Sequence, residues 1–126
     1  MGERKAEPTY DDATVTARLQ AELPHWQLED GTIRRTYRTA GWKSTLMVVN
    51  TIGHLAEAAW HHPDLLARYG SVEVRLRNHA AQGITDKDFE LARKIDDVVL
   101  WRPAAEGGAL EGTPSDPRFA YIKHES

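Results

Sequence analysis

The chain has 126 residues, which is enough for one compact domain and too few for two ordinary ones. A hydrophobic fraction of 40% with a charged fraction of 28% is typical of a globular protein, and a net charge of −3 gives no general attraction for nucleic acid or an anionic membrane. Cysteine is absent, which excludes disulfides, thiolate metal sites and cysteine nucleophiles. No apolar run approaches bilayer length and the polar start MGERKAEPTYDD has no signal-peptide core, so we expect a cytoplasmic protein.

The first ordered element is predicted to be a helix over about residues 10–23, after a disordered lead-in at 1–8. Thr9 followed by Asp12 is typical of a helix start, because a hydroxyl and a carboxylate can accept hydrogen bonds from the free amides of the first turn. The apolar residues that follow recur at helical spacing: Val15, Leu19 and Leu23. Pro24 ends the segment.

A β-hairpin is predicted between His25 and Arg38. Asp30-Gly31 is a strong signal of a tight hairpin turn. Before the turn, Trp26 and Leu28 alternate with polar neighbours. After it, three residues share one parity: Ile33, Arg35 and Tyr37. These patterns indicate two short antiparallel strands.

The second helix is predicted over residues 42–60, the longest periodic stretch of the chain. Its expected apolar face consists of residues three, four and seven apart: Trp42, Leu46, Val49, Gly53, Ala56 and Trp60. Pro63 is expected to close this helix, because the residue before a proline is pushed away from helical geometry.

Two further strands are predicted within residues 65–78, followed by a third helix. In the strands, Val72, Val74 and Leu76 alternate with Glu73, Arg75 and Arg77, which indicates a sheet with one face in water. Thr85 with Asp88 three residues later opens the helix. Its expected apolar stripe is Phe89, Ala92, Ile95 and Val99.

Beyond Trp101 the composition shifts to proline, glycine and small residues. We expect residues 101–126 to form an extended C-terminal tail that rejoins the domain through Phe119, Tyr121 and Ile122. The predicted order of the domain, residues 9–100, is helix, hairpin, helix, hairpin, helix. Because short turns favour antiparallel pairing, the sequence predicts an α+β fold with a four-stranded antiparallel sheet that helices cover on one face.

Histidines are the most prominent candidates for chemistry. His61 and His62 lie where the second helix ends, and His79 lies where the last strand ends. Imidazole titrates near neutral pH, so histidines that share a cleft can donate and accept protons without large pKa shifts. These two ends meet if the strand runs back alongside the helix, which makes an acid–base cleft plausible.

Structural interpretations of the same residues remain open. A single histidine at a helix end usually interacts with free carbonyls or with the helix dipole. Neighbouring histidines diverge, whereas zinc needs three or four convergent ligands, so we expect no metal site at His61 and His62. Asp88 stands at the third position of a helix, where a capping role is as reasonable as a catalytic one.

The spacing of these residues resembles the signature of the pterin-4a-carbinolamine dehydratase family. The order is Glu57, three residues, His61-His62-Pro63, five residues, Tyr69, nine residues, His79, eight residues, Asp88. The segments GITDKD, before the last helix, and LARKI, inside it, also resemble the family's equivalents. The resemblance covers about residues 9–100.

The resemblance implies an αββαββα fold, homodimers that pair into homotetramers, and no metal or further cofactor, because the pterin is the substrate. The family removes water from 4a-hydroxytetrahydropterin to give quinonoid dihydropterin, which recycles the cofactor of aromatic amino acid hydroxylases. Matched to the motif, His61, His62 and His79 surround the pterin. His62 is assigned as the leading acid, and His61 or His79 takes the second proton. The positions expected to bind the substrate or to orient the imidazoles are Glu57, Trp60, Pro63, Asn78 and Asp88.

Two positions depart from the family pattern. Asn78 stands where the family usually has Thr or Ser, and Trp60 replaces a small polar residue before the histidine pair. Together with the added tail, they motivate a second hypothesis in which the fold serves as a binding or assembly protein. Some family members resemble assembly factors for RuBisCO in carboxysome operons, and others act as dimerisation partners of a transcription factor.

Overall fold

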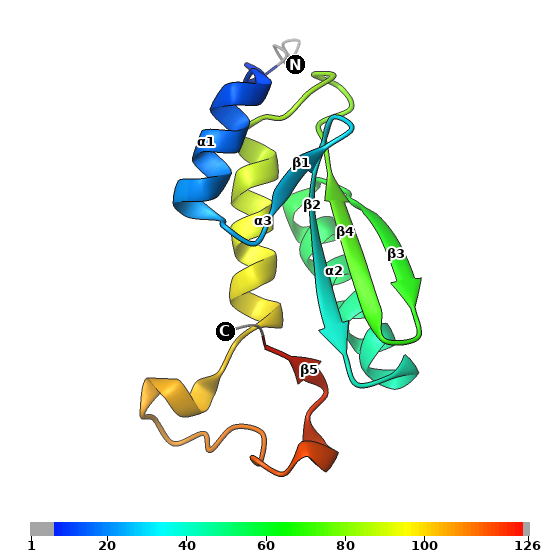
Figure 1. The fold of residues 1–126 in the computed structure, drawn as a ribbon, viewed down its shortest axis with the longest axis vertical. Coiled ribbons are helices and arrows are strands. Elements are labelled where there is room, and N and C mark those ends of the chain that lie inside the picture. The colour runs from blue at the N-terminus through cyan, green and yellow to red at the C-terminus, as the bar shows by residue number, and fades with distance from the viewer. Residues whose placement is uncertain (1–6, 125–126) are drawn as a thin grey trace.

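A computed structural model describes residues 7–124 of the chain. Most of the predicted lead-in, residues 1–8, lies outside this range, and within it Glu7 forms an ion pair of 3.0 Å with Lys87. The elements are α1 (Asp12–Glu22), β1 (Gln27–Glu29), β2 (Thr32–Thr39), α2 (Trp42–Ala59), β3 (Asp64–Arg68), β4 (Ser71–Leu76), α3 (Asp86–Val99) and β5 (Ile122–Lys123), with two 3₁₀ turns, Pro103–Glu106 and Pro117–Phe119, in the tail (Figure 1). Among the described residues, no helix has the length and apolar character needed to span a membrane.

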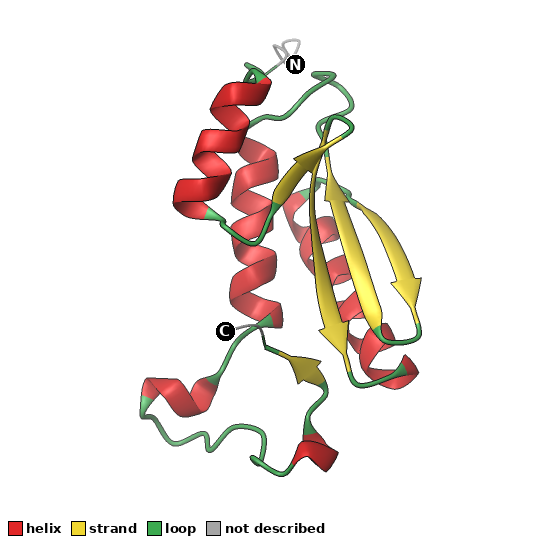
Figure 2. Cartoon of the chain, viewed as in Figure 1, coloured by secondary structure: helices red, strands yellow, loops and turns green. Residues whose placement is uncertain are grey.

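The predicted sheet is confirmed, and the tail adds one strand to it. All pairings are antiparallel, and the first four strands lie in the order β1-β2-β4-β3. The short β5 pairs with Arg38 and Thr39 of β2, beyond the stretch of β2 that β1 covers. Figure 2 shows α2 behind β2, β4 and β3, with no element crossing the near side of these strands. The helices therefore cover one face of the sheet, as predicted.

The first hairpin follows from its turn residues. Asp30 and Gly31 both adopt positive φ, 48° and 74°, which is the geometry whose twist matches antiparallel strands. The resulting register places the predicted set of Ile33, Arg35 and Tyr37 on the buried face. The hairpin prediction is therefore confirmed.

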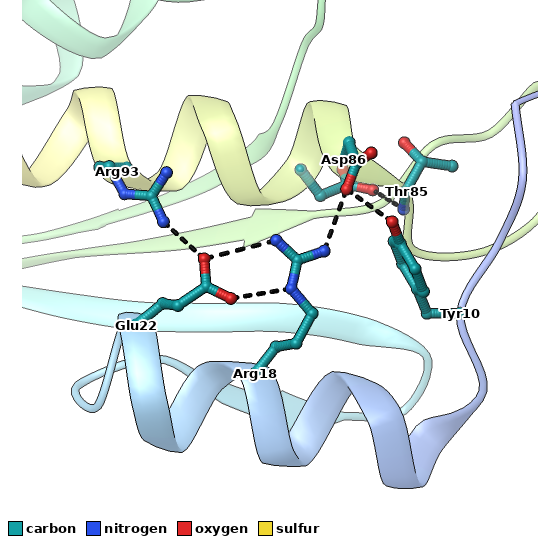
Figure 3. A network of polar contacts seen from close by, with 7 residues as sticks. Tyr10, Arg18, Glu22, Thr85, Asp86 and Arg93 are labelled. Carbon is teal, nitrogen blue, oxygen red and sulfur yellow. Dashed lines mark hydrogen bonds and ion pairs between the residues drawn. The ribbon is translucent and has the colours of Figure 1, made fainter.

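Helices α1 and α3 are tied together by a surface network of charges (Figure 3). Asp86, in the first turn of α3, accepts hydrogen bonds from the Tyr10 hydroxyl at 2.8 Å and from Arg18 at 3.0 Å. Glu22 accepts from Arg18 at 2.8 Å and from Arg93 at 2.7 Å. The network also explains why the guanidinium of Arg18 lies 4.0 Å from the centre of the buried Phe89 ring.

The predicted start of α1 requires a correction. Asp11 caps the helix, with its carboxylate accepting a hydrogen bond from the Thr14 amide at 2.8 Å, and neither Thr9 nor Asp12 fills this role. Thr9, Asp11 and Asp12 all carry side chains that could cap a helix at this point. The Tyr10 amide donates to the Ile84 carbonyl, and this contact fixes the backbone so that Asp11 is the residue that caps the helix. A side-chain cap at this helix start is therefore confirmed, with Asp11 as the capping residue.

The predicted apolar face of α2 is wrong at four of its six positions, because only Ala56 is buried and Val49 partly buried. The buried residues are Ser44, Thr45, Val48, Ile52 and Ala56, whereas Trp42, Leu46 and Trp60 are exposed. The physical reason is a buried polar contact at the start of the helix. The Thr45 hydroxyl donates to the Tyr69 carbonyl at 3.0 Å and shares a hydrogen bond of 2.7 Å with the Thr39 hydroxyl, so this helix turns a polar residue inward.

Helix α3 has the predicted inward stripe, because all four of its expected residues are buried. One turn before its end, Asp96 accepts hydrogen bonds from the Trp26 indole, from Arg35 and from the Tyr37 hydroxyl. Burial and the neighbouring Asp96 carboxylate raise the pKa of Tyr37. This contact fixes α3 to β2 and to the start of β1.

The tail rejoins the domain through two of the three predicted residues, the side chain of Ile122 and the backbone of Tyr121. Ile122 is buried in the core cluster and lies in β5, and the Ala40 amide donates to the Tyr121 carbonyl at 3.2 Å. The side chains of Phe119 and Tyr121 are exposed, so the predicted contact through Phe119 is not formed by a buried side chain. In a strand as short as β5, alternation allows a single side chain to face inward.

Candidate functional site

The candidate site begins at the C-terminal end of α2, where the conformation of Trp60 ends the helix. Trp60 is in the left-handed conformation, with φ 53° and ψ 46°. Its amide donates to the Glu57 carbonyl at 3.2 Å, and the His61 amide donates to the Ala56 carbonyl at 3.1 Å. This pair of bonds is a Schellman ending, which reverses the chain. The helix thus stops at Ala59, ahead of Pro63, and the prediction that Pro63 closes it is corrected.

The reversed chain directs His61 toward the start of α3. Its side chain is buried, and Nε2 lies 2.6 Å from Oδ1 of Asp88. Asp88 is fully buried, and its second oxygen, Oδ2, accepts a hydrogen bond from the Thr85 amide at 2.9 Å. Asp88 therefore caps α3 and binds His61 at the same time. The capping role of Asp88 is confirmed, and its catalytic role stays a prediction.

Thr85 and Asn78 connect this pair to the end of β4. The Asn78 side-chain amide donates to the Thr85 hydroxyl at 3.3 Å, and its carbonyl oxygen accepts from the Ala81 amide at 3.0 Å. Asn78 and Gly83 also exchange two backbone hydrogen bonds, of 2.9 and 3.2 Å. An amide side chain carries its donor and its acceptor on separate atoms, so Asn78 can hold the α3 cap and the loop together.

The loop held by Asn78 carries His79. This histidine is exposed, and within residues 7–124 its side chain makes no hydrogen bond or ion pair. The structure therefore links His79 to His61 only through the backbone of Asn78 and the Thr85–Asp88 contacts. A direct contact among the three predicted histidines is not formed.

His62 lies on the solvent side of the same chain reversal. Its Nε2 is 2.6 Å from Oε1 of Glu57, and the two side chains are 49% and 67% exposed. The Trp60 indole, 70% exposed, meets the His62 ring edge-on, with a centroid distance of 5.0 Å and an interplanar angle of 82°. Pro63 follows and is half-buried. Here an accessible imidazole is oriented by a carboxylate on one side and by an aromatic ring on the other.

The end of α2 thus carries two histidine–carboxylate pairs, one buried and one exposed. A carboxylate bound to one ring nitrogen fixes the orientation and the tautomer of an imidazole, and leaves the other nitrogen for proton transfer. This arrangement can perform general acid–base chemistry. In the part of the chain that the structure describes, no group of three or more His, Asp or Glu side chains is placed to hold a metal ion.

A hollow of about 420 Å³ opens beside His61, between α2 and α3. Its lining residues are Leu55, Ala58, Ala59, His61, Lys87, Glu90, Leu91 and Lys94. His62 and His79 are not among them, so this hollow differs from the predicted cleft, which would collect all three histidines. Its lining combines apolar side chains with the charged Lys87, Glu90 and Lys94, and His61 is the imidazole among them.

Comparison with known proteins assigns the family. The family model for pterin 4 alpha carbinolamine dehydratase matches residues 8–98, which include every predicted site residue. The chain belongs to the pterin-4-alpha-carbinolamine dehydratase family. Relatives whose names give the same assignment provisionally include a protein of Aquifex aeolicus, 46% identical over 61% of this chain and 78% of its own length, and one of Chloroflexus aurantiacus, 41% identical over 73% of this chain and 98% of its own.

A solved structure supports the dehydratase fold. The crystal structure described as a transcriptional coactivator/pterin dehydratase from Brucella melitensis superimposes with a TM-score of 0.66 at 26% identity. The match covers 73% of this chain and 99% of that one. The family model ends at residue 98, so the tail with β5 lies outside the region shared with the dehydratase family model.

One part of this candidate site does not follow from the sequence patterns. The sequence predicts Thr85 only as a helix cap, whereas in the structure its amide and hydroxyl join Asp88 to Asn78. The available signal was the capping box itself, because its buried carboxylate has a second oxygen that needs a partner.

Proposed function

We propose that this chain catalyses the dehydration of 4a-hydroxytetrahydropterin to quinonoid dihydropterin and water. Family membership supports the pterin substrate. The observation that carries the proposal is the pair of imidazole–carboxylate contacts at the end of α2, His61–Asp88 and His62–Glu57, both of 2.6 Å. The reaction breaks the C4a–O bond while N5 loses a proton, so it needs an acid for the leaving hydroxyl and a base for N5.

His62 is proposed as the acid. Its ring is accessible, and Glu57 and Trp60 hold it from two sides, so a proton on the free nitrogen can be presented to a bound hydroxyl. The proton from N5 goes to His79, whose side chain is exposed, or to Nδ1 of His61, since Asp88 occupies Nε2. In this proposal Asn78 positions the His79 loop, and Trp60 and Pro63 shape the surface beside His62.

No metal or further cofactor enters this scheme, because the proton transfers are within reach of histidine. The pterin itself is the substrate. Exposed apolar side chains on α2, Trp42, Leu46 and Met47, offer a contact surface for a second copy, which supports the expectation of a homodimer or homotetramer.

The test is turnover of freshly generated 4a-hydroxytetrahydropterin by wild type and by His62→Ala. We expect the wild type to exceed the uncatalysed rate, and His62→Ala to lose about 10²-fold in kcat, the usual size of an acid–base contribution. His124→Ala, in the tail at the other end of α3, is the matched control and should keep wild-type turnover. A wild type no faster than the uncatalysed reaction would exclude the proposal.

Assembly or binding of a protein client is the second candidate function. The exposed apolar residues of α2 and a tail outside the family match favour it, and the Brucella relative is itself described as a coactivator. The client expected from the family resemblance is RuBisCO. The turnover assay tests only the dehydratase function, and binding of purified RuBisCO to the folded wild type tests the second function directly.

A further inference from the structure

The uncovered face of the sheet carries a row of cationic side chains at one end. The register aligns Lys123 of β5 with Arg38 of β2, Arg38 with Ser71 of β4, and Ser71 with Arg68 of β3. Paired residues of neighbouring strands point to the same side, and the neighbours Tyr37 and Ile122 point into the core. The four side chains therefore stand in one line on the outer face, which we call the cationic row.

The three cations of this row are free of partners within residues 7–124. The side chains of Arg38, Arg68 and Lys123 are exposed and make no ion pair or hydrogen bond with any described residue. Farther along the same face, Arg75 pairs with Glu73 at 2.7 Å and Arg34 lies 3.8 Å from Glu29, whereas Arg77 forms no ion pair with a described residue. The row therefore groups three cations at one end of the face that no described carboxylate pairs with.

The tail completes the row. Ile122 is buried beside the end of β2, and the alternation of a strand then forces Lys123 to face outward next to Arg38. The family model stops at residue 98, so this third cation comes from the part of the chain that the model does not match. The tail therefore adds both a strand, β5, and a positive charge, Lys123, to this end of the sheet.

We propose that the cationic row binds an acidic, extended segment of a protein partner. Strands lie about 4.8 Å apart, so the row from Lys123 to Arg68 spans roughly 14 Å across four strands. An extended chain presents side chains on one face about every 6.7 Å, so three alternate carboxylates span the same length. The Ser71 hydroxyl, between Arg38 and Arg68, can donate a further hydrogen bond to a carboxylate.

The charge around the row favours this partner over nucleic acid. Duplex binding requires neutralisation of many phosphates along a continuous basic surface. Here the next charged side chain along β4 is Glu73, and the whole chain carries a net charge of −3. A short acidic segment meets only the row and avoids the carboxylates beyond it.

The proposal is tested by fluorescence anisotropy with a labelled peptide of about twelve residues, alternating aspartate and threonine, at about 20 mM salt, where screening is weak. We expect salt-sensitive binding that Arg38→Glu with Arg68→Glu weakens by about tenfold, because two attractions become repulsions. Lys123→Ala should weaken it by about twofold. The matched control, Lys43→Glu with Lys94→Glu, changes the net charge equally with exposed cations of α2 and α3 and should weaken it less than about threefold.

Equal weakening by the two double variants would overturn the proposal, because it would show a general charge effect. Absence of peptide binding to the wild type, or tighter binding of a DNA duplex than of the peptide, would also overturn it. Circular dichroism confirms that each variant is folded before it is compared. The outcome is independent of pterin turnover, since the row contains none of the residues proposed for the dehydration.

Discussion

Replacement of Asp88 tests whether one buried carboxylate holds the site together. Its two oxygens accept from the Thr85 amide at 2.9 Å and contact His61 Nε2 at 2.6 Å, and the side chain is fully buried. In Asp88→Ala the helix loses its capping bond, worth about 1 kcal/mol. The lost bond to His61 contributes about 1.5–3 kcal/mol, and both partners are left buried without an acceptor. We expect the free energy of unfolding to fall by about 3–4 kcal/mol.

The measurement is equilibrium urea unfolding followed by the fluorescence of the four tryptophans and by far-UV circular dichroism. Asp86→Ala is the control in the same helical turn, where the carboxylate is exposed and the expected loss is below about 1 kcal/mol. Asp88→Asn keeps the shape and the capping oxygen, and should lose about 1–2 kcal/mol.

A double-mutant cycle isolates the contact with His61. Asp88→Ala and His61→Ala, alone and together, should give a coupling free energy of about 1–2 kcal/mol. A coupling below about 0.5 kcal/mol would refute the reasoning, since it would mean that the 2.6 Å contact does not stabilise the fold. An Asp88→Ala variant no less stable than Asp86→Ala would refute the assigned burial penalty.

Two further predictions concern backbone conformation and pH. Trp60→Gly should raise the free energy of unfolding by about 0.5–1 kcal/mol, because it removes the cost of a left-handed tryptophan. As a control, Ala58→Gly inside α2 should lower the free energy of unfolding by a similar amount. Urea midpoints check both variants, and a Trp60→Gly variant less stable than the wild type would contradict the first expectation. Hydrogen bonds from Arg18 and Arg93 lower the pKa of Glu22, and those from Tyr10 and Arg18 lower the pKa of Asp86. Their stabilisation is therefore complete above the unfolded pKa of about 4 and is lost as the pH falls through the lower folded values. Thermal midpoints of wild type should fall more steeply between about pH 5 and pH 2 than those of Glu22→Gln with Asp86→Asn, and equal slopes would count against the network of Figure 3.

Features that depend on neighbouring residues were predictable from the sequence alone. The Asp30-Gly31 turn requires positive φ at two consecutive positions, which few residue pairs adopt at low cost, so the hairpin and its register followed directly. The inward stripe of α3 and its capping box also arise within one helix. The spacing from Glu57 to Asp88 was sufficient to indicate the family that the comparisons then showed.

Features that depend on contacts between residues far apart in the sequence followed only from the tertiary structure. The buried face of α2 is set by the Thr39–Thr45–Tyr69 contact, which counting apolar residues cannot detect because the inward residue is polar. Asp88 binds His61 because the left-handed Trp60 turns the chain toward α3, and no helical or strand period encodes that turn. The alignment of Lys123 with Arg38 and Arg68 likewise depends on strand register across four strands and on the burial of Ile122, 21 residues beyond Trp101. Local sequence patterns therefore specify the helices, the hairpins and the family, whereas packing between these elements specifies which side chains meet.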